Sequence, residues 1–447
     1  MIQKRLIYAA CGLLSLLIPL AAKGQVGGFS QGNVPTIGSG QMPTAIPGDD
    51  LVPTNVFQMQ IAAGARFDDN ALPSSPVKHS DIGYSFTPSL AFVQTLRRVD
   101  WGVSYGPGLD ISQHRFYANQ FTNDFGGHFK WLLSKHSMFS AQQNYILSTN
   151  PFQQFGSQPF TTTPGPIVAP NQSIYLANFR RTSSLSQAQY SYQLSARTTF
   201  GMSGSFGLER YRNTSGSGAI TRLINSQVAS GQAYISHQVS ARNKLGFQYG
   251  AQVLKFPQAN ARTTTHTFSI FDEVKLTPNQ SFTVYAGPQY SLTSNQVELN
   301  AGFFLVTIPV KANTWSWSGG GIYNFTGRRV AIVLNYSRGV SNGAGVTGAV
   351  ELNGGSAVLS WKLSSRWSMN LNLAAADNQL LAVKTGQNDL RTYSASLGLS
   401  RQIFRNMSMN FFFERLNQVG SIAGIATGNH DLAGVSFQYN FLKPVGR

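Results

Sequence analysis

Residues 435–441 read Val435-Ser436-Phe437-Gln438-Tyr439-Asn440-Phe441, with an apolar side chain at every odd position and a polar one at every even position. Residues 393–397 alternate in the same way. A period of two belongs to a β-strand, because successive side chains of a strand point to opposite faces. From residue 55 onward this unit recurs along the chain, each time followed by a turn and a returning stretch. The repetition predicts a large closed sheet with an apolar outside and a polar inside.

The composition fits a membrane β-barrel. Only 11% of the 447 residues are charged, whereas charged residues make up about a quarter of an ordinary soluble domain. No stretch after residue 25 has the run of about 18 apolar residues that a membrane helix needs. A secreted β-solenoid or adhesin would share this composition. The net charge of +17 would suit a nucleic-acid partner, but no nucleic-acid-binding module is visible, so no such partner is expected.

Three segments divide the chain. Residues 1–24 are typical of a signal peptide, with Lys4 and Arg5 ahead of an apolar core. Residues 25–54 are rich in Gly, Pro, Gln and Ser, which predicts a flexible N-terminal linker in the periplasm. Residues 55–447 are expected to form the barrel.

The strand ladder predicts a transmembrane, antiparallel, up-and-down β-barrel of about 18 strands, with 16 as the alternative. Connections alternate between short ones, which we assign to the periplasm, and long polar ones, which we assign to the exterior. The expected long loops lie near residues 149–183, 210–227, 293–312, 339–354, 377–388 and 416–430. This topology places the protein in the outer membrane of a Gram-negative bacterium. Its expected partners are outer-membrane lipid, lipopolysaccharide and the barrel assembly machinery.

The tryptophans support this orientation. Trp101, Trp131, Trp361 and Trp367 stand close to short connections, and Trp315 and Trp317 stand at the opposite rim. Aromatic girdles occupy these two levels in membrane barrels. Asp272 departs from the alternating pattern, because its position in the strand falls among the apolar, lipid-facing residues. A bulge near Phe271 would reset the register.

Strand parity separates the inner wall from the lipid-facing surface. The side chains expected to line the pore are Gln187, Gln189, Gln193, Gln248, Gln252, Gln289, Asn370 and Asn372. Amide side chains of this kind hydrogen-bond neutral polar solutes and water. Positive charge is expected mainly at turns and loops. There it either meets anionic headgroups or forms a basic vestibule that gathers anionic solutes.

The segment Asp68-Asp69-Asn70 follows the first expected strand. Two carboxylates and an amide can hold a hard cation such as Ca²⁺, but Asp and Asn are also ordinary turn residues. No metal site, catalytic site or cofactor is predicted.

The first third of the chain resembles the β-barrel porin 2 family, over roughly residues 55–148. The resemblance lies in four motifs: Phe67-Asp68-Asp69-Asn70, His79-Ser80-Asp81, Thr87-Pro88-Ser89-Leu90 and Trp101-Gly102-Val103-Ser104-Tyr105. It implies an outer-membrane barrel with a pore-like role, often associated with exopolysaccharide export. Phe67 replaces the tyrosine usual in this family. The resemblance marks Asp68, Asp69 and Asn70 as a signature of unknown role.

Three functions remain open at this point. The first is a porin-like channel for polar solutes, including saccharides, or for polymer export. The second is a structural or adhesive barrel that displays its external loops. The third is an outer-membrane hydrolase using His266 or His237, although the histidines form no catalytic cluster by spacing. We therefore expect no enzymatic activity.

Overall fold

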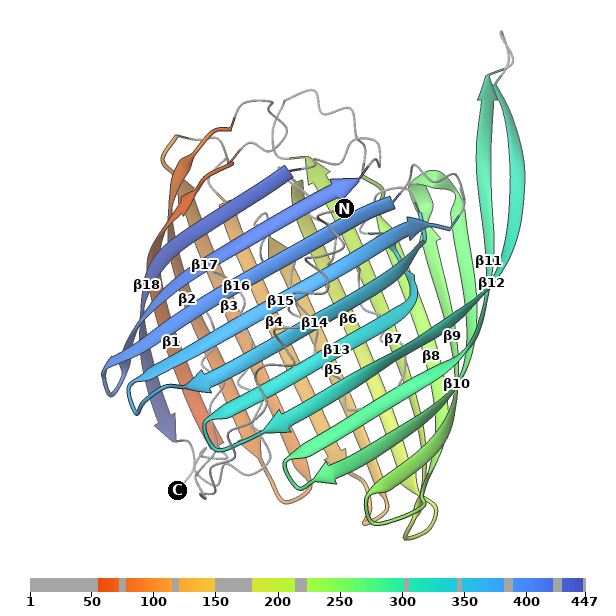
Figure 1. Cartoon of the computed structure of the whole chain (residues 1–447), viewed down its shortest axis with the longest axis horizontal. Coiled ribbons are helices and arrows are strands. Elements are labelled where there is room, and N and C mark those ends of the chain that lie inside the picture. Colours follow the sequence, from red (N-terminus) through yellow and green to blue (C-terminus); the bar gives the residue numbers. More distant parts are fainter. Residues whose placement is uncertain are drawn as a thin grey trace, which may run out of the picture.

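A computed structural model describes residues 55–71, 78–114, 120–148, 179–213, 223–300, 305–343, 348–381, 389–420 and 428–444. These residues form one sheet of 18 antiparallel strands that closes on itself, as predicted (Figure 1). The strands are β1 Asn55–Asp68, β2 Asp81–Thr95, β3 Val99–Ser112, β4 Gln120–Leu132, β5 Ser137–Ser148, β6 Phe179–Gln193, β7 Thr198–Asn213, β8 Ser226–Gln238, β9 Asn243–Phe256, β10 Ala261–Thr277, β11 Gln280–Asn300, β12 Leu305–Thr326, β13 Val330–Ser341, β14 Val350–Lys362, β15 Trp367–Leu380, β16 Asp389–Phe404, β17 Met407–Gly420 and β18 Gly428–Pro444. The signal peptide and linker predicted for residues 1–54 lie outside the described residues.

The barrel closes where its first strand meets its last. β1 pairs with β18 from Val56 opposite Pro444 to Asp68 opposite Leu432. β18 therefore continues three residues beyond Phe441, where the sequence pattern ends it. An even number of strands brings the start of β1 and the end of β18 to the same rim, which is the rim of the short turns.

The two rims differ in their connections. The rim that we assign to the periplasm carries short turns, such as residues 96–98 between β2 and β3 and residues 405–406 between β16 and β17. The opposite rim carries longer connections, with two exceptions. β9 and β10 are joined through the 3-10 turn η2 (Pro257–Ala259). The loop expected at 293–312 is instead strand, because β11 and β12 stay paired up to Asn300 opposite Leu305. They form a ribbon that projects beyond the rim (Figure 1).

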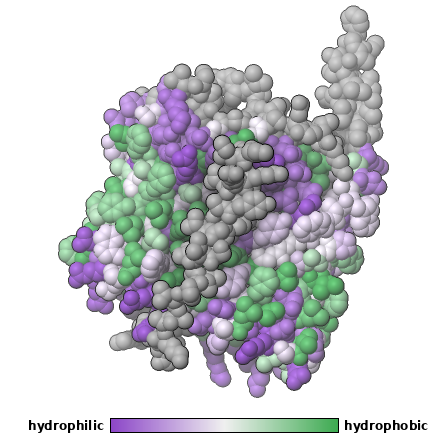
Figure 2. Space-filling model, viewed as in Figure 1, coloured by the Kyte–Doolittle hydropathy of each residue, from purple (hydrophilic) through white to green (hydrophobic). Residues whose placement is uncertain are grey.

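The outer surface of the barrel is apolar. Along β18 the outward side chains Phe437, Tyr439 and Phe441 are all exposed, and Phe247 and Phe268 are each 58% exposed. Figure 2 shows hydrophobic side chains gathered over the wall and hydrophilic ones toward the rims. Such a surface would be costly in water but matches the hydrocarbon core of a bilayer. The protein is an outer-membrane β-barrel.

No helix in the described part of the chain is both long enough and apolar enough to cross a membrane.

Tryptophans face outward at the predicted levels. Trp131 and Trp361 are exposed near the periplasmic rim, and Trp315 and Trp317 are exposed toward the external rim. Arg338 stacks over Trp317 at 4.7 Å from the ring centroid. Amphipathic side chains of this kind anchor a barrel at the two membrane interfaces.

The bulge predicted near Phe271 is absent. β10 pairs with β9 without interruption from Ala261 to Val274, and its register shift lies between Lys275 and Thr277. Asp272 therefore faces outward, while Phe271 faces inward and is buried. The carboxylate is tolerated because it lies only five residues from the periplasmic end of β10, where the cost of a charge on the lipid side falls.

Large aromatic side chains on the inner wall lie flat across glycines of neighbouring strands. A Cβ at Gly246 would stand 2.3 Å from Cζ of Phe271, and one at Gly201 would stand 2.2 Å from Cζ of Tyr234. Phe271 also packs against Tyr234 and Tyr285. Because each ring occupies the place of a missing Cβ, these aromatics lie along the wall rather than across the lumen.

Candidate functional site: the lumen, its external bridge and the seam

Parity in the described strands places every predicted lining residue on the inner face. Gln248 and Gln289 are the most buried of them, and each donates a side-chain hydrogen bond to a residue of a neighbouring strand. Gln248 Nε2 donates to Gln232 Oε1 at 3.0 Å, and Gln289 Nε2 donates to Ser316 Oγ at 3.0 Å. The remaining residues are Gln252 on β9, Gln187, Gln189 and Gln193 on β6, and Asn370 and Asn372 on β15. The β15 pair therefore lies on a separate part of the wall from the glutamines.

The external mouth of the lumen is bridged on one side. Asn342 directly follows β13, yet its Nδ2 donates to Glu209 Oε2 on β7 at 2.5 Å and to Ser226 Oγ on β8 at 2.8 Å. Four strands, β9 to β12, separate β13 from β8 around the barrel. These bonds therefore join segments that are not neighbours in the wall. We call Ser341–Gly343 and Gly348–Val350 the bridge segment.

Glu209 is the polar centre of this contact. It is 1% exposed and faces the lumen, where Arg181 of β6 forms an ion pair with Oε1. Tyr211 donates its hydroxyl to Oε2 at 2.7 Å. A buried carboxylate needs partners of this kind, because leaving it unpaired is expensive. The network therefore fixes the carboxylate that holds Asn342.

An apolar cluster forms the other half of the bridge. Val228, Leu254 and Phe256 point inward from β8 and β9, and Ala349 of the bridge segment packs on them. Val340 and Leu381 also pack against this cluster. Apolar side chains on a polar inner wall would face water in an open lumen, so covering them stabilises the bridged arrangement.

The sequence did not reveal this bridge. It indicated a long external loop at 149–183, which would either constrict the lumen or cap the rim, and residues 149–178 lie outside the described residues. Asn342 stands in Ser341-Asn342-Gly343, which is typical of an ordinary turn. The available signal was the inward parity of Val228, Leu254 and Phe256, which breaks the polar pattern of that wall.

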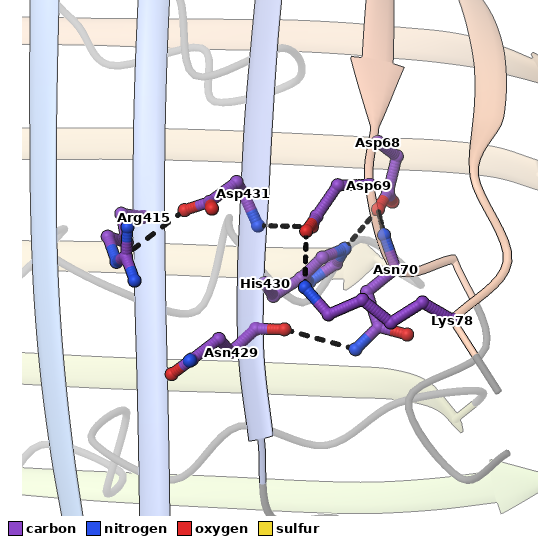
Figure 3. A network of polar contacts seen from close by, with 8 residues as sticks. All are labelled: Asp68, Asp69, Asn70, Lys78, Arg415, Asn429, His430 and Asp431. Carbon is purple, nitrogen blue, oxygen red and sulfur yellow. Dashed lines mark hydrogen bonds and ion pairs between the residues drawn. The ribbon is translucent and has the colours of Figure 1, made fainter. Parts of the chain in front are cut away.

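The signature residues Asp68, Asp69 and Asn70 lie where β1 meets β18, at the external rim (Figure 3). Beyond the backbone ladder, their side chains continue the pairing. Asp431 N donates to Asp69 Oδ1 at 2.6 Å, and Asn70 Nδ2 donates to the Asn429 carbonyl at 3.0 Å. Asp68 binds the ring of His430 and accepts from Asn70 N at 2.9 Å, an Asx-turn. We call Asp68, Asp69, Asn70, Asn429, His430 and Asp431 the seam clasp.

A cation site was one reading of this segment. Asp68, Asp69 and His430 bring one ligand atom each within 4.8 Å of one another. However, the Lys78 ammonium lies 2.7 Å from Asp69 Oδ2 and supplies positive charge there. In Figure 3 the Asn70 amide turns toward Asn429 rather than toward the two carboxylates. The contacts therefore assign these residues to joining the strands.

The charges of the clasp are coupled. Burial tends to raise the pKa of Asp69, but hydrogen bonds from Lys78 and from the Asp431 amide outweigh it, and the pKa lies below its ordinary value. The same contact raises the pKa of Lys78. Both groups are therefore charged at neutral pH.

The inner wall carries more acid than the sequence pattern indicated. Asp110 on β3, Asp124 on β4 and Glu414 on β17 all have inward parity, and Asp110 and Asp124 are buried. Glycines occupy the inward positions 102, 106 and 108 of β3, so that strand has no run of polar side chains to reveal its inner face. These three carboxyl groups are absent from the set of lining residues that the sequence pattern predicted.

The two histidines considered for hydrolysis face outward. His266 Nδ1 lies 2.8 Å from the hydroxyl of Tyr249, and His237 Nδ1 lies 3.0 Å from that of Thr198. The two lie on different strands, β10 and β8, and these contacts account for both as wall residues.

No protein-family model and no curated protein sequence matches the chain. Among solved structures, it is similar to OpdQ of Pseudomonas aeruginosa, with 8% identity over 88% of this chain and 100% of that chain and a TM-score of 0.42. OccK8 (OprE) of the same organism is 12% identical over 87% and 98% of the two chains, with a TM-score of 0.41. The ferric-catecholate import receptor Fiu of E. coli K12 is 9% identical over 86% and 81%, with a TM-score of 0.43.

Likeness at this level does not decide a function. The barrel implied by the resemblance to the β-barrel porin 2 family is present. Membership of that family and a link to exopolysaccharide export stay predictions.

Proposed function

We propose that the protein is an outer-membrane channel for polar solutes, with an external mouth that the bridge segment narrows. The observation that carries this proposal is the contact of Asn342 with Glu209 and Ser226, because it joins non-neighbouring strands at the mouth of an 18-stranded barrel. Barrels of 16–18 strands are wide enough for an aqueous channel unless inserted segments fill them. A segment folded across the mouth is a means of setting the width of such a channel.

The part of the wall that carries glutamines suits uncharged, hydroxyl-bearing solutes such as saccharides. Gln189, Gln248, Gln252 and Gln289 face inward and present both donors and acceptors. Each contact with a passing solute is weak and replaceable by water, which passage through a channel requires. Export of a polysaccharide would use the same chemistry over a greater length.

Cross-linking the bridge tests the channel. The only cysteine of the sequence, Cys11, lies in the predicted signal peptide, so Ser226→Cys with Asn342→Cys introduces the only pair expected in the mature protein. The folded barrel in planar bilayers is expected to conduct ions, and joining the two thiols with a short reducible cross-linker should lower conductance until reduction restores it. Each single-cysteine variant, treated identically, is the control. A folded wild-type protein that gives no conductance would refute the channel.

Solute size separates uptake from polymer export. Proteoliposomes carrying the barrel should swell in solutions of small sugars, with rates that fall steeply as oligosaccharides lengthen. A polymer conduit would instead pass long chains, with a rate set by chain width rather than chain length.

The projecting ribbon supports display as a second candidate function. Residues 305–318 of β12 pair with β11 alone, because β12 meets β13 only from Gly319 onward. Ser294 pairs with Lys311, so a two-residue Asn-Gly turn joining these positions would shorten the ribbon without disturbing the barrel. Lost attachment of cells to surfaces, with unchanged conductance, would favour display.

A further inference from the structure

Acidic side chains of the inner wall gather on one side of the barrel, and closure of the seam brings them together. Glu414 lies on β17, while Asp110 and Asp124 lie on β3 and β4, far away in the sequence. The order β17, β18, β1, β2, β3, β4 makes this a continuous stretch of wall. We call Asp110, Asp124 and Glu414 the acidic wall.

Arg66 is the cation at the centre of this stretch. Its Nη1 lies 3.3 Å from Asp110 Oδ1, and the pair is almost fully buried. The register of β17, β18 and β1 places Glu414 across β18 from the end of β1, close to Arg66. One guanidinium group therefore lies near two carboxyl groups, and Asp124 adds a third acidic group to the same face. Among the described residues, the inner face of this stretch holds more carboxyl groups than basic side chains.

A buried hydroxyl on this wall has no hydrogen-bond partner. Thr122 is 2% exposed, faces inward on β4 two residues from Asp124, and its Oγ1 makes no hydrogen bond. A Cβ on Gly108 would stand 2.3 Å from that oxygen, so the glycine leaves the hydroxyl its space. A buried polar atom without a partner is costly, and a passing donor such as an ammonium group would satisfy it.

The chain as a whole is basic, so the location of the charges decides selectivity. The turn arginines of the periplasmic rim, such as Arg197 and Arg242, are exposed to water, where salt screens their charge over about 8 Å. The acidic wall lies inside a barrel with a low-dielectric wall, which focuses its field into the lumen. Rings of carboxylates select cations in channels for this reason.

We infer that the acidic wall, with the Thr122 hydroxyl, makes the lumen selective for small cationic solutes that carry an ammonium or guanidinium group. This inference rests on the proposed channel and specifies its solute class. Neutral saccharides would still pass, but anions would be disfavoured despite the net positive charge of the chain.

Ion selectivity in planar bilayers tests the inference. Under a KCl gradient at pH 8, the wild-type reversal potential should show a preference for K⁺ over Cl⁻ of about threefold or more. Asp124→Asn combined with Glu414→Gln should reduce that preference at least about twofold, because two charges leave the wall while the Arg66–Asp110 pair remains. The control is Asp272→Asn, which removes a carboxylate from the outer face and should leave the preference unchanged. A wild-type channel that prefers chloride would overturn the inference while leaving the channel intact.

A binding measurement tests the cationic site even if the purified barrel does not conduct ions. Spermidine binding to the detergent-folded protein, followed by calorimetry, should be saturable in the wild type and in Asp272→Asn. It should weaken about tenfold or more in the Asp124→Asn, Glu414→Gln variant. Binding without conductance would refute the channel and keep the cationic site. Equal binding by all three proteins, or none by the wild type, would overturn the site.

Thr122 provides a second test that changes no charge. Thr122→Val removes the hydroxyl and keeps the shape of the side chain. Spermidine should bind this variant more weakly than the wild type, while the stability of the barrel stays equal or rises, because an unpaired buried hydroxyl has been removed. Unchanged binding would remove Thr122 from the site.

Discussion

Asp69 and Asp431 bind each other in both directions across the seam of the barrel. The amide of Asp69 donates to the carbonyl of Asp431 at 3.0 Å, and the amide of Asp431 donates to Oδ1 of Asp69 at 2.6 Å. The carboxylate thus takes the place of a backbone acceptor after the ladder of β1 has ended. The contact holds the first and last strands together at the external rim.

Replacing Asp69 by alanine should therefore weaken the closure. The Asp431 amide would lose its acceptor, so we expect a loss of about 1–3 kcal/mol in the free energy of unfolding. The temperature at which the folded barrel loses its fast migration in gel electrophoresis measures the change. Asp389→Ala is the control, since it removes a carboxylate from the same rim away from the seam. Equal effects of the two substitutions would contradict a clasp.

The ionic part of the clasp should show in the dependence of stability on pH. The pKa of Asp69 is lowered in the folded protein, so its charged form stabilises the fold. That contribution is present above the ordinary value of 3.8 and is lost as the pH falls through the folded pKa. Asp69→Asn keeps an acceptor but no charge. The stability gap between wild type and this variant should be constant from neutral pH to about 5 and close below about 3.8.

Lys78→Met should weaken that pH dependence, because it removes one of the two hydrogen-bond donors that hold the pKa of Asp69 below its ordinary value. The effect is expected to be small, since the ammonium is exposed to solvent and salt screens it. Urea titrations at a series of pH values, followed by tryptophan fluorescence, would measure both variants. A Lys78→Met protein with an unchanged pH profile would assign the pKa shift to the Asp431 amide alone.

The sequence predicted those features that depend on local periodicity. Alternation in stretches such as 435–441 gave the strand faces, the closed antiparallel sheet and the inward parity of Gln248 and Gln289. Features set by contacts between distant segments escaped it. Asn342 shows only the composition of a turn, and its bonds to Glu209 and Ser226 depend on the course of β13 at the rim.

The acidic residues of the inner wall could not be predicted where glycine interrupts the polar pattern of a strand. Along β3 three inward positions, 102, 106 and 108, are glycine, so Asp110 does not stand in a continuous run of polar side chains. The ribbon of β11 and β12 was missed for a different reason. Its polar stretch at 293–300 reads as loop, although in the structure the backbone hydrogen bonds of the two strands satisfy each other.

The bridge should open when the attractive contact between residue 342 and Glu209 is made repulsive. Asn342→Asp places a second carboxylate against Glu209, whereas Asn342→Ala only removes the donor. Each lost hydrogen bond of about 1.4 kcal/mol shifts the balance between bridged and open states about tenfold, and alanine removes the bonds to both Glu209 and Ser226. Charge repulsion in the aspartate variant should shift the balance further. Single-channel recordings should show conductance or open time rising from wild type through alanine to aspartate. Ser184→Ala, on the outer face, is the control. Equal conductances and open times in the wild type and both Asn342 variants would contradict a bridge.

The packing of aromatic rings against inner-wall glycines can be tested by comparing a glycine that a ring covers with one that no ring covers. A Cβ at Gly246 would lie 2.3 Å from Cζ of Phe271 and 2.7 Å from the carbonyl oxygen of Ile235. At Gly250, on the same strand and the same face, the nearest atoms are 3.9 Å away. Gly246→Ala should therefore cost about 1–3 kcal/mol, because the ring must leave the wall or strain its rotamer. Gly250→Ala should change stability little, since its methyl group meets no close neighbour. Thermal unfolding of both variants measures the difference, and a displaced Phe271 ring should also lower the conductance of Gly246→Ala. Equal stabilities would show that the ring does not depend on the missing Cβ.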